Sequence, residues 1–102
     1  MNWQFEWDTG KLSKMELVKK SGRIFTVSEL ESVFEDKNAI TEKTTLDFIT
    51  GEQRFIVYGK SSEDRVICVI FVIRTKIRIF NFWKLKGLKL KKYYEKIRRM
   101  ES

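Results

Sequence analysis

The feature that most constrains the fold is an uninterrupted apolar run of eight residues, Val66 to Ile73. Valine and isoleucine fill most of the run, and β-branched residues of this kind favour an extended chain. Because both faces of the run are apolar, we expect a central strand over residues 65–73 that is buried on both sides. The run is far shorter than the roughly 20 residues that a membrane-spanning helix needs.

Weaker strand patterns lie on either side of this central strand. Residues 54–58 and 77–82 are rich in β-branched and aromatic side chains, and polar turns separate each of them from the central run. Trp3, Phe5 and Trp7 alternate with polar residues and predict a short strand at the start of the chain. Residues 36–44 have the composition of a loop that contains at most one more short strand.

Three segments have helical character. The first is expected over about 10–21 and ends at Ser21-Gly22, since glycine is favoured just past a helix end. The second follows a capping Thr26 or Ser28 and has apolar residues at helical spacing. The last is expected over about 83–100, with an apolar stripe on an otherwise basic surface.

The order of these elements predicts an α+β fold. We expect an antiparallel sheet of about four strands, two N-terminal helices and a basic C-terminal helix. With 102 residues the chain is long enough for one core and too short for two, so we expect a single domain over 1–102.

Charge is distributed very unevenly along the chain. Residues 1–73 hold 10 Lys/Arg and 12 Asp/Glu, a balance of −2, whereas residues 74–102 hold 11 Lys/Arg and 2 Asp/Glu, a balance of +9. So local an excess of positive charge indicates an acidic partner: a nucleic acid, an acidic protein or an anionic surface.

Cysteine and histidine usage excludes several classes of site. Cys68 is the one cysteine and lies inside the apolar run, so we expect a buried core residue in a reducing compartment. The chain has no histidine, no paired metal ligands and no glycine-rich nucleotide loop. We therefore expect no metal or nucleotide cofactor. The N-terminus does not have the pattern of a signal peptide, which favours a soluble cytoplasmic protein without a membrane partner.

The candidate binding residues are mostly cationic. Lysines and arginines fill the polar positions of the last helix, and a dense run of like charges destabilises a helix slightly. Binding to a polyanion explains this pattern, and so does a lysine-rich face that serves only solubility. Arg74, Lys76, Arg78 and Lys84 gather around the last hairpin, where they form either a phosphate clamp with Arg54 or an ordinary charged face.

Glu52 and Arg54 are two residues apart and point to the same side of an extended backbone. They can form a simple ion pair, or a general base beside a phosphate-binding arginine.

The ordered pieces of the chain together resemble the BrnT ribonuclease toxins, which share the RelE-like fold. These pieces are Phe5-Glu6-Trp7-Asp8 with Lys11, Val33-Phe34-Glu35-Asp36, Gly51-Glu52-Gln53-Arg54-Phe55, Tyr58-Gly59-Lys60-Ser61, Arg65 to Phe71, and Ile77-Arg78-Ile79-Phe80 before a basic helix with Tyr93. The resemblance implies an endoribonuclease that arrests translation, and a cognate BrnA-like, DNA-binding antitoxin that neutralises it. It implies no metal. It also implies an oligomer formed through the antitoxin, and it places recurring polar residues of the family at Lys11, Glu52, Arg54, Arg65, Arg78 and Tyr93.

We therefore expect RNA cleavage by attack of the substrate's own 2′-hydroxyl on the adjacent phosphate. Arg54 and Arg78 are the candidates to stabilise the phosphorane, Glu52 is the candidate base, and Lys84 or Tyr93 is the candidate acid. The expected RNA-binding residues are Lys11, Arg65, Arg74, Lys76, Lys89, Lys91 and Lys92.

Three positions depart from the family pattern. Ser21 stands where the family commonly has histidine, Trp83 where it has arginine, and Lys89 where it has glutamate. These replacements favour an alternative in which the scaffold binds nucleic acid or an acidic protein without cleaving RNA. A further alternative is an interaction protein whose lysines serve only solubility.

Overall fold

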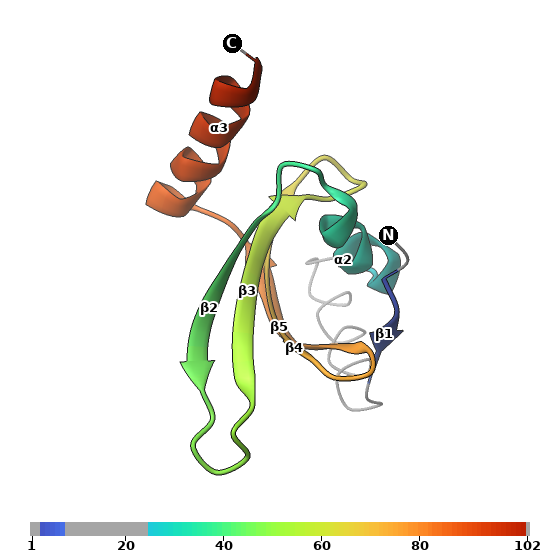
Figure 1. Cartoon of the computed structure of the whole chain (residues 1–102). Coiled ribbons are helices and arrows are strands. Elements are labelled where there is room, and N and C mark those ends of the chain that lie inside the picture. Colours follow the sequence, from blue (N-terminus) through green and yellow to red (C-terminus); the bar gives the residue numbers. More distant parts are fainter. Residues whose placement is uncertain (1–2, 8–24, 102) are drawn as a thin grey trace.

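A computed structural model describes residues 3–7 and 25–101 of the chain. The helix expected over 10–21 and the candidate residue Lys11 lie outside the described residues. The described elements follow in the order β1, α2, η1, β2, β3, β4, β5 and α3. Figure 1 shows a twisted sheet with α2 beside it, while α3 extends from its other side and ends far from β1.

Within the described residues the sheet has five strands, in the order β1-β5-β4-β3-β2. The strands are β1 (Phe5–Glu6), β2 (Ile40–Leu46), β3 (Gln53–Lys60), β4 (Val66–Ile73) and β5 (Ile77–Lys84). β1 pairs with β5 in parallel, and the other neighbours are antiparallel. The sheet is therefore mixed, and the prediction of about four antiparallel strands is wrong in both respects. The α+β class is confirmed.

β4 is the central strand that its sequence predicts. It pairs with β3 on one side and β5 on the other, and six of its eight residues are buried. Both of its faces carry apolar side chains, so β4 contributes to an apolar cluster on each side of the sheet.

Only one of the two expected N-terminal helices falls within the described residues. α2 (Val27–Ser32) continues into a turn of 3₁₀-helix, η1 (Val33–Glu35). Thr26 caps α2, because its side-chain oxygen accepts a hydrogen bond of 3.0 Å from the Glu29 N–H.

The last helix starts later than expected. α3 spans Gly87–Glu101, whereas residues 77–84 form one continuous strand. Lys84 still pairs with Ile67, so the ladder with β4 extends to the end of that strand. Trp83 and Lys84 therefore belong to β5 and not to the helix. Gly87 has φ +71°, a conformation that glycine adopts without strain, and it begins α3.

Each face of the sheet has its own apolar cluster. Leu30 and Val33 pack with Val57, Ile67 and Val69 on the α2 face, among other buried residues. On the α3 face Tyr93 and Leu85 pack with Tyr58, Val66 and Cys68. Cys68 is buried as predicted, and burial raises the pKa of its thiol to about 12. In the described part of the chain no helix is long and apolar enough to cross a membrane.

Candidate nucleic-acid interface

Arg54 and Arg78 lie on the α3 face of the sheet, one on each side of β4. Both have Val72 as their neighbour across the ladder, so their Cα atoms are roughly 10 Å apart, two strand spacings. The register between β4 and β5 shifts between Ile70 and Phe71, which leaves Phe80 as an extra residue opposite them. The Phe80 ring lies 4.8 Å from the Arg54 guanidinium carbon and 6.0 Å from that of Arg78. One aromatic ring thus supports two cations on the same face.

Two carboxylates flank this pair of arginines. Arg74 donates to both Glu52 oxygens, at 2.8 and 3.2 Å. Arg78 lies 3.6 Å from a carboxylate oxygen of Glu6 on β1. The hydrogen bonds from Arg74 lower the pKa of Glu52, and the charge of Arg78 lowers it further. Glu52 is therefore ionised at neutral pH, and Arg74 holds its carboxylate beside the other two arginines. We call Glu52, Arg54, Arg74 and Arg78 the arginine site.

The basic residues of α3 gather at the other end of the same face. Lys89 and Lys92 contact the carboxylate of Glu42 on β2, at 3.0 and 2.9 Å. The Tyr58 hydroxyl donates to the same carboxylate at 2.6 Å. The hydrogen bond from Tyr58, followed by those from Lys92 and Lys89, lowers the pKa of Glu42 to about 2. This carboxylate fixes α3 against the sheet.

Glu42 should make the stability of the fold sensitive to acid. Its pKa is lowered on folding, so the stabilisation is present above the ordinary carboxyl value and is lost as the pH falls from about 4.5 through 2. We expect Glu42→Gln to lower the free energy of unfolding at pH 7 by about 1 kcal/mol, since the ion pairs are partly exposed. The difference from the parent should disappear near pH 2.

Urea denaturation at several pH values measures this difference. The exposed Glu35 provides a control, because Glu35→Gln should change the free energy of unfolding at pH 7 by less than about 0.5 kcal/mol. A pH-independent difference for Glu42→Gln would contradict the role of its charge.

Lys84 lies far from the arginine site. Its ladder partner Ile67 is five positions along β4 from Val72, roughly 17 Å at about 3.3 Å per residue. Lys84 borders a pocket of about 250 Å³ with Trp83, Lys86, Lys89 and apolar residues of the sheet. The structure therefore separates Lys84 from Glu52.

Tyr93 is buried beneath α3, with 1% of its surface exposed. Its hydroxyl donates a hydrogen bond to Asp36, a carboxylate that also accepts from the Lys60 N–H at 2.7 Å. Burial and the Asp36 hydrogen bond raise the pKa of Tyr93 far above its ordinary value. Its proton is committed to an internal contact, which is a structural role.

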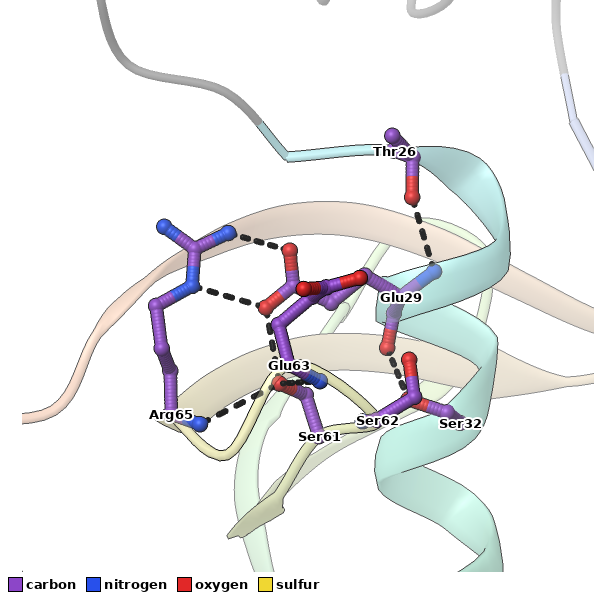
Figure 2. Close-up of polar contacts among 7 residues, drawn as sticks. All are labelled: Thr26, Glu29, Ser32, Ser61, Ser62, Glu63 and Arg65. Atoms are coloured by element: carbon purple, nitrogen blue, oxygen red, sulfur yellow. Dashed lines mark hydrogen bonds and ion pairs between the residues drawn. The ribbon is translucent and has the colours of Figure 1, made fainter.

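Arg65 also makes an internal contact (Figure 2). Its guanidinium binds both oxygens of Glu29, with 2.8 Å between Nε and Oε2. The guanidinium carbon also lies 4.6 Å from the centre of the Phe25 ring. Glu29 is 2% exposed and accepts a further hydrogen bond of 2.7 Å from the Ser61 hydroxyl. This network joins α2 to the turn between β3 and β4. It borders a pocket of about 390 Å³ that is lined by Thr26, Glu29, Glu63 and Arg65.

The remaining predicted RNA-binding residues are at the surface. Lys76 is exposed in the turn between β4 and β5, and Lys91 is exposed on α3. Within residues 3–7 and 25–101 there is no group of three or more Cys, Asp or Glu side chains that could hold a metal ion.

Sequence reasoning did not identify Glu6, Glu42 or Phe80 as members of this surface. Each of them contacts residues that are distant in sequence. Phe80 is the exception in part, because the alternation Ile77-Arg78-Ile79-Phe80 indicates that it shares a face with Arg78. The two cationic regions share one face of the sheet, and an extended polyanion that follows this face would meet both.

Comparison with known proteins identifies a family. Residues 7–85 match the family described as ribonuclease toxin, BrnT, of type II toxin-antitoxin system. No curated protein matched the chain.

Proposed function

Because the chain belongs to the BrnT ribonuclease toxins of type II toxin–antitoxin systems, we propose that it cleaves RNA at the arginine site without a metal ion and thereby arrests translation. One observation carries the choice of site: Arg54 and Arg78 flank β4 on one face, next to an ionised Glu52. A RelE-like arrangement of the toxin is part of the same proposal.

The proposed reaction needs little more than positioned charge. The 2′-hydroxyl of the substrate attacks the adjacent phosphorus, and Glu52 accepts its proton. Arg54 and Arg78 stabilise the negative charge of the phosphorane, where preorganised cations contribute most. The bond from phosphorus to the 5′-oxygen then breaks, solvent protonates the leaving oxygen, and a 2′,3′-cyclic phosphate remains.

Two residues have different roles from those first expected. Tyr93 supports α3 through Asp36, and it takes no part in proton transfer in this proposal. Lys84 is too far from the arginine site to act as the acid, whereas Lys89, Lys91 and Lys92 of α3 contact the RNA backbone beyond the cleaved bond. Such contacts are electrostatic and therefore weaken with salt.

A cleavage assay on a long unstructured RNA in the presence of EDTA tests the proposal. We expect the parent to cleave and to leave cyclic phosphate ends, with unchanged rates when EDTA is added. Tyr93→Phe should cleave as fast as the parent under conditions where it remains folded, because only its hydrogen bond to Asp36 is lost. If a folded Tyr93→Phe variant cleaved about 100-fold more slowly than the parent, the Tyr93 hydroxyl would have to take part in proton transfer.

A second candidate function is RNA binding without cleavage. Trp83 and Lys89 replace residues that the family pattern leads one to expect, and the acidic partners Glu6 and Glu52 already occupy two of the three arginines. Intact RNA that shifts on a gel in a salt-dependent manner would support this candidate.

A type II toxin family implies a cognate antitoxin protein. We propose that this antitoxin is a BrnA-like, DNA-binding protein, that it assembles with the toxin into an oligomer, and that it competes with RNA for the positive face. Release of bound RNA when the antitoxin is added would support this competition.

A further inference from the structure

The hairpin between β2 and β3 exposes two large apolar side chains at its tip. Phe48 is 91% exposed and Ile49 is 96% exposed, and Leu46 beside them is also exposed. In Figure 1 this hairpin reaches beyond the other strands of the sheet. Exposed apolar groups of this size, gathered at one place, commonly mark a binding site.

Hydrogen bonds hold the tip in one conformation. One oxygen of the Asp47 side chain accepts from the N–H groups of Ile49 at 2.9 Å and Thr50 at 3.3 Å. The Asp47 backbone donates to Glu52 at 2.9 Å and accepts from the Gly51 N–H at 2.7 Å. Gly51 has φ +73°, which closes the turn without strain. The exposure of Phe48 is therefore a property of an ordered turn.

The tip borders a pocket that also contains a residue of the arginine site. The pocket has a volume of about 320 Å³ and is lined by Thr45, Leu46, Asp47, Phe48, Ile49 and Arg54. This volume is at the lower end of the range for small-ligand pockets. Its lining combines the aromatic Phe48, aliphatic side chains and the opposite charges of Arg54 and Asp47. Aromatic rings and guanidinium planes are groups on which proteins stack nucleobases.

We infer that the Phe48 pocket binds one base of single-stranded RNA next to the phosphate at the arginine site. The inference rests on the proposed function and adds to it a residue that selects unpaired RNA. Arg54 belongs to both sites, and the turn that carries Phe48 leads directly into Glu52. A nucleotide whose phosphate lies between Arg54 and Arg78 thus has an aromatic surface within reach of its base.

Charge favours RNA over a protein as the occupant. Arg54 lines the pocket together with the carboxylate of Asp47, and the positive excess comes from the rest of the face on which Arg54 lies, which also carries Arg78 and the lysines of α3. A polyanion with flat apolar bases is complementary to both parts of this surface.

The test measures binding to a short single-stranded RNA whose 2′-hydroxyls are all methylated, so that cleavage by 2′-hydroxyl attack is impossible. An abasic oligonucleotide with the same backbone is the reference. We expect Phe48→Ala to weaken binding of the base-bearing RNA about 5- to 150-fold, the usual contribution of one stacked base. Binding of the abasic strand should not change, and Phe48→Trp should bind as well as the parent.

Leu88→Ala is the matched control, because Leu88 is an apolar residue of α3 that is 84% exposed. It should bind both strands like the parent. Equal losses of affinity for the two strands, or no loss with Phe48→Ala, would overturn the inference. The pocket would then be a candidate binding site for a protein. If the parent binds base-bearing RNA through Phe48 but never cleaves natural RNA, the inference stands and the proposed catalysis fails.

Discussion

Replacing Arg65 by methionine is expected to lower the free energy of unfolding by about 3 kcal/mol. Among the described residues, the substitution leaves the Ser61 hydroxyl as the side-chain donor to the Glu29 carboxylate, in a site where Glu29 is 2% exposed. A buried charge that loses its partner costs about 3–5 kcal/mol. We take the lower end of this range because the Arg65 side chain is 33% exposed and Ser61 still donates.

A double-mutant cycle in urea separates the charge effect from the loss of packing. Glu29→Met with Arg65→Met removes both charges, and the pair should recover most of the stability lost by Arg65→Met alone. Equal destabilisation of the single and double variants would contradict a charge-based explanation. RNA affinity gives a second measurement. The folded Arg65→Met protein should bind RNA nearly as well as the parent, because the guanidinium is engaged with Glu29.

The sequence predicted the central part of the sheet and missed its edges. Residues 54–58, 65–73 and 77–82 are apolar enough to identify β3, β4 and β5. β2 has Thr41, Lys43, Thr44 and Thr45 at exposed positions, so it resembles a loop in composition. It forms because its backbone pairs with β3 at the edge of the sheet, where few side chains are buried. The parallel contact of β1 with β5 joins residues that local patterns cannot relate.

The candidate site was predicted in part for the same reason. Alternation predicts that Arg78 projects from one face of its strand, but only the pairing of both strands with β4 shows that Arg54 shares this face. The continuation of β5 through Lys84 could not be predicted, because pairing with Ile67 decides it and the local sequence does not. Tyr93 and Arg65 resemble surface groups in sequence, and only their contacts with Asp36 and Glu29 show internal roles.

Replacing Arg78 by alanine is expected to slow RNA cleavage about 10²- to 10³-fold. In the proposed reaction Arg78 stabilises charge that develops only in the transition state, and removal of one such donor typically has an effect of this size. The loss should appear in kcat more than in KM, since other cations still bind the backbone. Arg78→Lys should recover part of the rate, because it restores the charge without the planar donor geometry.

Folding should survive this change, since the 3.6 Å contact of Arg78 with Glu6 is partly exposed, and surface ion pairs contribute about 0–1 kcal/mol. Lys43→Ala is the charge-matched control. Lys43 is exposed on β2 and pairs with Phe55, which belongs to the apolar cluster on the α2 face of the sheet. It should cleave within about twofold of the parent, as expected for a surface change away from the reacting groups.

Arg54→Ala and the double variant Arg54→Ala/Arg78→Ala test whether the two arginines act together. Both arginines contact the Phe80 ring and are proposed to act on one phosphate, so their effects should not add. A double variant that is hardly slower than either single variant would indicate that the two cations act as a unit. Cleavage by Arg78→Ala at the rate of the parent would instead show that the reaction takes place elsewhere on the protein. In that case the arginine site would be left with RNA binding as its function.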